Sequence, residues 1–179
     1  MPLTTYEEAR PWARAIREEV LTRRMPKWHA VRGYGDFTND PSLSPFEIAT
    51  IVAWADGGAP KGPDTPAVGT NASPASRNEN DGKPVDRTVR TLTLPCGDQP
   101  LPVGRIVGIE PRLDPKGSVG IAVRQPDGSR EIVAWIRGFE PDFRATYWLR
   151  NPIVTRRGTR LIATADSRCS VVLSIRSSR

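Results

Sequence analysis

Few residues could carry metal or nucleophilic chemistry, because the chain has one histidine, His29, and two cysteines, Cys96 and Cys169. A zinc centre needs three or four Cys, His or carboxylate ligands at local spacing. A Ser-His-Asp or Cys-His site would have to be centred on His29, which follows Trp28 in a loop far in sequence from either cysteine. We therefore expect His29 to pack beside Trp28 rather than to act as a base. The sequence predicts no catalytic residues, and the chain is not expected to be an enzyme.

The two cysteines bracket most of the carboxyl-terminal half of the chain. A disulfide between them would remove about 4 kcal/mol of unfolded-state entropy. Two buried free thiols are the alternative, and separation in sequence does not decide between the two.

The composition excludes a coiled coil and a membrane span. The 179 residues include 18 Pro and 15 Gly. No apolar run approaches the roughly 18 residues that a transmembrane helix needs, and the first residues lack a basic stretch followed by an apolar one. We expect no membrane span and no signal peptide in this chain.

The net charge of +6 comes from residues 96–179, where arginines are scattered between apolar residues. This alternation is typical of the solvent face of a sheet, and it favours that interpretation over a groove for nucleic acid. We therefore do not expect a nucleic-acid partner.

Residues 1–24 predict a helix. Thr5 and Glu8 have the spacing of a capping box, and apolar residues recur behind them at helical spacing. Pro11 is expected to bend the first turn or to mark the start of a second helix.

Residues 25–41 mix Pro, Gly and aromatic residues without periodicity, which indicates an irregular loop. A further helix is expected between Ser44, a strong N-cap candidate, and Gly57. Glu47 completes a second capping box.

From Thr91 onward the pattern changes to short β-rich runs spaced by about ten residues, which is typical of a sandwich or barrel. The predicted strands are 91–94, 104–110, 118–124, 130–136, 146–150, 160–165 and 170–175.

The predicted fold class is α+β, with two structured regions. A small helical segment spans residues 1–60, a Pro/Gly-rich flexible linker spans residues 61–90, and an antiparallel, jelly-roll-like β-sandwich spans residues 91–179.

Three runs of the helical segment carry a specific resemblance, namely Pro2–Arg17, Arg24–Ala30 with its motif Met25-Pro26-Lys27-Trp28-His29, and Leu43–Pro60. Residues 2–62 closely resemble the later portion of a mono-haem c-type cytochrome module. In large exported bacterial proteins this module often precedes a β-sandwich related to copper type II, ascorbate-dependent monooxygenases of the peptidylglycine-hydroxylating kind. The resemblance implies electron transfer as the function and the periplasm as the location.

The family binds haem covalently through a Cys-x-x-Cys-His segment just before the position of Pro2, and that segment supplies the proximal histidine. Met25 aligns with the methionine of the other axial position. The resemblance therefore implies that Met25 is the metal ligand and that Trp28 and Tyr34 are further haem-binding residues that shield the cofactor.

This chain has no Cys-x-x-Cys-His, so it cannot attach haem covalently by itself. Haem c is expected only if an upstream segment supplies the motif. Met1 is then an internal methionine taken as the start of a fragment, or else the chain is a haemless remnant. Without haem, Met25 is expected to fill a gap between the helices.

Residues 100–166 resemble the monooxygenase sandwich more weakly, through Leu101–Pro111, Pro126–Ser129, Tyr147–Leu149 and Gly158–Leu161. Copper-binding relatives carry a histidine pair soon after the first run, where this chain has Arg112–Lys116. The sandwich contains neither His nor Met, so we expect no copper chemistry and a structural or interaction role.

The predicted function is an electron-transfer module, or a truncated or degenerate fragment of one, with a redox partner protein if haem is loaded. The alternative is a non-catalytic domain whose β-sandwich docks a protein partner or an acidic glycan.

Overall fold

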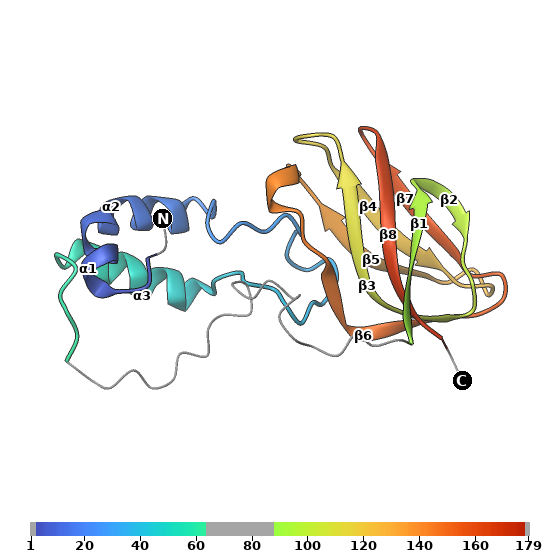
Figure 1. Cartoon of the computed structure of the whole chain (residues 1–179), viewed down its shortest axis with the longest axis horizontal. Helices are drawn as coiled ribbons and strands as arrows, with labels where there is room; N and C mark the ends of the chain where they lie inside the picture. Colours follow the sequence, from blue (N-terminus) through green and yellow to red (C-terminus); the bar gives the residue numbers. More distant parts are fainter. Residues whose placement is uncertain (1–2, 64–87, 178–179) are drawn as a thin grey trace. The chain divides into compact units, whose positions relative to one another are not determined.

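The computed structural model describes residues 3–63 and 88–177, and its contacts divide the chain into two units (Figure 1). One unit is helical and comprises Met1–Trp28 and Pro41–Asn78; the other contains the β-strands and comprises His29–Asp40 and Glu79–Arg179. The predicted linker at 61–90 lies for the most part outside the described residues.

The amino-terminal helical segment is broken into three pieces: α1 at Tyr6–Ala9, the 3-10 turn η1 at Arg10–Trp12, and α2 at Ala13–Leu21. The predicted capping box is confirmed, since the Thr5 side chain accepts from the Glu8 amide and Glu8 caps the Thr5 amide in return. Pro11 lies in the 3-10 turn, as expected for a residue that cannot continue the hydrogen-bond ladder of an α-helix.

The second predicted helix is α3, Pro45–Asp56. Ser44 caps it in a capping box with Glu47, and Gly57 closes it, as the sequence predicts.

Polar contacts hold the helical unit together around a small apolar centre. Arg17 of α2 forms an ion pair with Asp56 at the end of α3, with Nε and Oδ1 2.7 Å apart. The Tyr6 hydroxyl donates to the carbonyl of Ala59 at 2.8 Å, which ties the residues after α3 back to α1.

The β unit is a sandwich of two four-stranded antiparallel sheets, in the orders β1-β8-β3-β6 and β2-β7-β4-β5. Successive strands pass between the sheets except at the β4–β5 hairpin, and this order is that of a jelly roll. The strands are β1 Val89–Pro95, β2 Gly97–Pro100, β3 Gly104–Leu113, β4 Val119–Arg124, β5 Arg130–Ile136, β6 Tyr147–Thr155, β7 Arg160–Ala165 and β8 Cys169–Arg176.

The core lies between the two sheets and is supplied by alternate residues of each strand. On β4, for example, Val119, Ile121 and Val123 are fully buried, while the residues between them are half-exposed. This alternation is what predicted the strands, because successive side chains of a strand point to opposite faces.

The predicted strand set lacks β2, which the structure adds at Gly97–Pro100. β2 pairs with β7 along its whole length, yet it contains a glycine, a proline and two polar residues. Its sequence has no strand-like pattern because, as an edge strand of four residues, it buries little.

Residues 29–40, which we name the strap, bind the edge strands of both sheets. Ala30 forms an isolated bridge with Ile136 of β5, and Phe37 forms one with Leu149 of β6. The sequence predicts an irregular loop within the helical segment at 1–60; the contacts instead assign the strap to the sandwich unit. These contacts arise because the strap supplies hydrogen bonds that the two edges would otherwise lack.

Side chains reinforce the strap. The Asn39 amide donates to the Thr146 carbonyl at 2.8 Å and its oxygen accepts from the Trp148 amide at 3.0 Å. The Phe37 ring packs against Tyr147, with ring centroids 5.3 Å apart. Both aromatic residues are buried, so the strap closes one side of the core.

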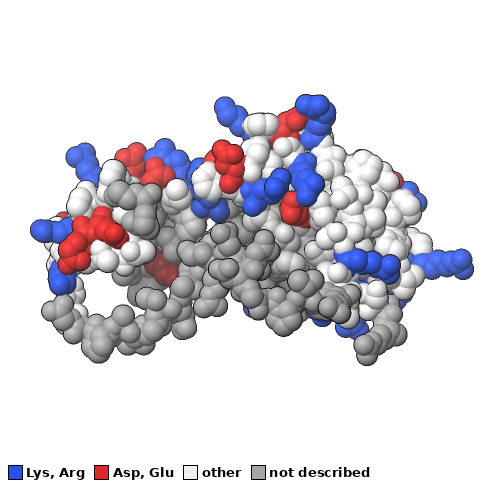
Figure 2. Space-filling model, viewed as in Figure 1, with Lys and Arg blue, Asp and Glu red and all other residues white. Residues whose placement is uncertain are grey.

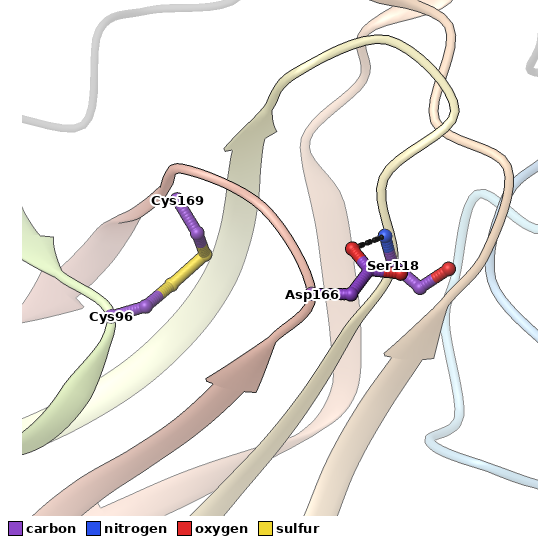
Figure 3. Close-up of a disulfide and its surroundings, with 4 residues drawn as sticks. All are labelled: Cys96, Ser118, Asp166 and Cys169. Atoms are coloured by element: carbon purple, nitrogen blue, oxygen red, sulfur yellow. Dashed lines mark hydrogen bonds between the residues drawn. A yellow bond between two sulfur atoms is a disulfide. The ribbon is translucent and has the colours of Figure 1, made fainter.

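A disulfide lies at the side of the sandwich formed by β1 and β2, away from the edge strands that the strap binds (Figure 3). Cys96, between β1 and β2, is bonded to Cys169 at the start of β8, with the two Cα atoms 5.4 Å apart. The structure thus decides between the two alternatives for the cysteines in favour of the disulfide, which links the β1–β2 connection to the first residue of β8.

The disulfide closes a sequence separation of 73 residues. Replacing both Cys96 and Cys169 by Ala is expected to lower the free energy of unfolding by about 4 kcal/mol, because the unfolded chain regains its loop entropy. Urea unfolding followed by circular dichroism measures the difference. Equal midpoints for the variant and the oxidised parent protein would contradict this prediction.

Tyr147 gives the sandwich a dependence on alkaline pH. Burial raises the pKa of its phenol, and a hydrogen bond with the His29 backbone acts in the opposite direction. The unfolded chain releases this proton near pH 10, whereas the folded chain retains it. The contribution of the neutral Tyr147 phenol to the free energy of unfolding is therefore fully present below pH 10 and is lost as the pH rises further. Between pH 8 and pH 11, we expect the free energy of unfolding to fall less in the Tyr147→Phe variant than in the parent protein. Urea unfolding measures both. Equal losses in both proteins would refute the assignment.

Candidate functional site

The helical unit contains an apolar groove of about 410 Å³ that runs along α2. Trp12, Ile16 and Val20 line it at successive helical turns, because residues four apart share one face of a helix. Leu3, Ala15, Glu19 and Met25 complete the lining.

Met25 reaches this groove through the turn that ends α2. The amides of Arg24 and Met25 both donate to the Glu19 carbonyl, at 2.9 and 3.3 Å, and Arg23 adopts a left-handed backbone with φ of 54°. The chain therefore folds back on the last turn of the helix. Met25 lines the groove and is 44% exposed.

The groove leaves large apolar side chains in contact with solvent. Trp12 is 49% exposed and Leu3 is 45% exposed. Apolar surface of this extent costs free energy in water, at about 25 cal/mol for each Å². Such a surface is typical of a site for a ligand or a partner, and its volume lies within the range of ligand pockets, about 300–1,000 Å³.

Of the three predicted haem-binding residues, the structure places only Met25 on the groove. Trp28 is half-buried and is absent from the lining. Tyr34 belongs to the strap, where its ring meets Trp135 edge-on with centroids 4.9 Å apart. Beside Met25, the groove is lined by Trp12 and Ile16.

His29 has a packing role in the strap. It is 8% exposed, its Nε2 accepts from the Glu140 amide at 3.3 Å, and its ring lies 5.6 Å from that of Phe139. Both cysteines are in the disulfide, so neither forms a thiolate pair with this imidazole. Across residues 3–63 and 88–177, no three His, Cys, Asp or Glu residues lie close enough together to hold a metal ion.

Several arginines of the sandwich, among them Arg112, Arg150 and Arg168, form ion pairs with nearby carboxylates. Asp98 bonds to both Arg124 and Arg160, and the hydrogen bond from Arg160 is the main cause that lowers the pKa of Asp98. Figure 2 shows basic and acidic side chains interspersed on the visible face. This arrangement fits the solvent face of a sheet better than a groove for a polyanion.

No helix among the described residues is long and apolar enough to cross a membrane.

Comparisons with known proteins yield no family. No protein-family model matches the chain, and no curated protein matches it. Among solved structures the chain is similar to a pentameric capsid protein isolated from metagenomic phage sequences, with a TM-score of 0.35 and 16% identity. The match covers 91% of this chain and 89% of that chain. A likeness at this TM-score carries no argument about the present protein.

The exposed apolar groove is expected to bind a neutral apolar dye such as Nile red. Ala15→Gln places a polar side chain at the groove without disturbing the helix, and it is expected to reduce Nile red fluorescence bound to the chain by about half or more. Arg14→Gln, at the neighbouring exposed position outside the lining, is the matched control. Equal dye binding by the two variants would show that the groove is not the dye site.

Proposed function

We propose that the helical unit is the methionine-bearing portion of a c-type cytochrome module and that it serves electron transfer. The observation that carries the proposal is the position of Met25 on an apolar groove of about 410 Å³, at the residue that the sequence resemblance assigns to the axial ligand. The α-helices are short, and the groove follows one of them.

The residues of the groove suit haem in their chemistry. The thioether of Met25 is a soft ligand for haem iron, and an apolar wall excludes water and raises the reduction potential. Trp12 and Ile16 form that wall, while the carboxylate of Glu19 is paired with Arg24. Bound haem would supply the one-electron chemistry, and the chain would hold the porphyrin and keep water from it.

The proximal histidine and the thioether cysteines have to come from another stretch of polypeptide. His29 is buried in the sandwich unit, and Cys96 and Cys169 form a disulfide. A Cys-x-x-Cys-His segment is absent from the sequence. The proposal therefore assigns to this chain one axial ligand and one wall of the haem site, and to an additional segment the covalent attachment.

We further propose that the protein works in an oxidising compartment such as the periplasm. The disulfide between Cys96 and Cys169 supports this location, because disulfides persist where thiols are not kept reduced. The sandwich is then a copper-free domain attached to the electron-transfer module.

A haem peptide tests the proposal on the chain as it exists. The peptide carries haem attached through Cys-x-x-Cys-His, so it supplies both the proximal ligand and the iron. Titration with the chain is expected to shift the Soret band of the ferrous peptide, since a thioether replaces the solvent ligand.

Met25→Ala is expected to abolish the shift. Leu21→Ala, an exposed apolar residue near the end of α2 and outside the groove lining, is the control and should retain it. An unshifted band with the parent chain, or a shift that Met25→Ala preserves, would overturn the proposal.

A further inference from the structure

The outer face of the sheet β2-β7-β4-β5 carries an aromatic residue beside an open glycine. Gly120 of β4 lies directly opposite Trp135 of β5 and Thr164 of β7 in the two antiparallel pairings. Their neighbours Val119, Ile121, Ala134, Ile136 and Ala163 are buried in the core. Because successive side chains alternate between faces, Gly120, Trp135 and Thr164 form one row on the solvent face.

A shallow cavity of about 270 Å³ lies over this row. Gly120 forms its floor, since a Cβ atom built there would meet no atom within 4 Å. Trp135, which is 38% exposed, lines it, as do the polar residues Ser118, Thr164 and Asp166.

The aromatic wall is held in place before any ligand arrives. The Trp135 carbonyl accepts from the strap amide of Val31 at 2.7 Å, and the Tyr34 ring packs against the indole at an interplanar angle of 78°. Neither Val31 nor Tyr34 lines the cavity, so the strap supports the indole without covering the open side. A fixed ring loses little conformational entropy on binding.

The polar rim is also ordered. The Asp166 carboxylate accepts from the Ser118 amide at 2.7 Å (Figure 3). The Asp166 amide donates to the Ser118 carbonyl at 3.2 Å. The Ser118 hydrogen bonds lower the pKa of Asp166, so its carboxylate is ionised at neutral pH and acts as a hydrogen-bond acceptor. Thr164 is exposed and lies across Gly120 from Trp135, on the same side of the floor as Asp166.

This combination selects one ligand chemistry. A pyranose ring has an apolar face of C–H groups, which suits an indole face and a floor without a side chain, and a hydroxyl rim, which suits a carboxylate and a threonine. The ionised Asp166 disfavours anionic sugars by like-charge repulsion. Arg137 lies over one side of the Trp135 ring, with its Cζ 5.9 Å from the ring centroid, and its charge disfavours a cationic ligand. The surface offered to the sugar is the part of the indole that lines the cavity, and Arg137 does not belong to that lining.

We propose that this cavity binds a single neutral pyranose residue of a glycan, with Trp135 as the stacking platform, Gly120 as the floor, and Thr164 and Asp166 as partners of the sugar hydroxyls. The site lies wholly in the sandwich and is independent of the haem proposal. The proposed ligand is neutral, unlike the acidic glycan considered from the sequence, because the carboxylate of Asp166 lines the cavity.

Gly120 allows a direct test. Its φ lies outside the left-handed region and the space above it is open, so Gly120→Val fills the cavity with a residue that strands favour. Ala122→Val is the matched control, since Ala122 lies on the same face of β4, two residues along and outside the cavity lining.

Cellohexaose, mannohexaose and chitohexaose are titrated into the full chain, and binding is followed by NMR chemical shifts. We expect at least one of them to bind, Gly120→Val to weaken that binding by about tenfold or more, and Ala122→Val to change it by less than about twofold. Trp135→Ala should weaken it to a similar extent as Gly120→Val, provided that its amide spectrum stays dispersed.

Three outcomes would overturn the proposal. The first is the absence of binding by all three neutral oligosaccharides at millimolar concentration. The second is equal binding by the Gly120→Val and Ala122→Val variants. The third is binding of oligogalacturonate or choline alone, which would assign the cavity to an anionic or a cationic ligand.

Discussion

The stability of the sandwich depends on how the backbone amide and carbonyl groups of its four edge strands find hydrogen-bond partners. A double sheet that does not close into a barrel leaves unpaired amide and carbonyl groups along each edge. Here β1 and β2 lie at one side and belong to one chain segment, pinned at Cys96 to Cys169. At the other side β5 and β6 are both bound by the strap, whose residues come from far earlier in the sequence. The strap thereby buries Phe37, His29 and Tyr147.

Local chemistry made the regular elements predictable. The capping boxes at Thr5 and Ser44 use residues three positions apart, so their geometry follows from the sequence alone. The alternation of buried and exposed residues in β4 predicts its inward face in the same way.

The strap was not predictable, because its partners are distant and its contacts are irregular. Asn39 uses its side-chain amide in place of a strand ladder to hold Thr146 and Trp148, more than 100 residues away. No periodicity indicates such a contact. The resemblance implies that Tyr34 shields haem, and in the structure its ring lies against Trp135. Trp12 was missed although it stands four residues before Ile16, the helical spacing that could have found it.

The two units differ in how completely they bury their large apolar side chains, and this difference bears on function. The sandwich buries its large aliphatic residues almost completely, as Ile106, Leu161 and Leu173 illustrate. In the described part of the helical unit, the apolar residues below one-tenth exposure are Ala13, Val20 and Ala59, while the larger Leu3, Trp12 and Met25 line the groove in partial contact with water. A body of this size with so small a core gains little from its own packing. Covering the groove with a ligand or a further chain segment would supply the missing burial, so the same residues that weaken the isolated unit are those that favour a bound group.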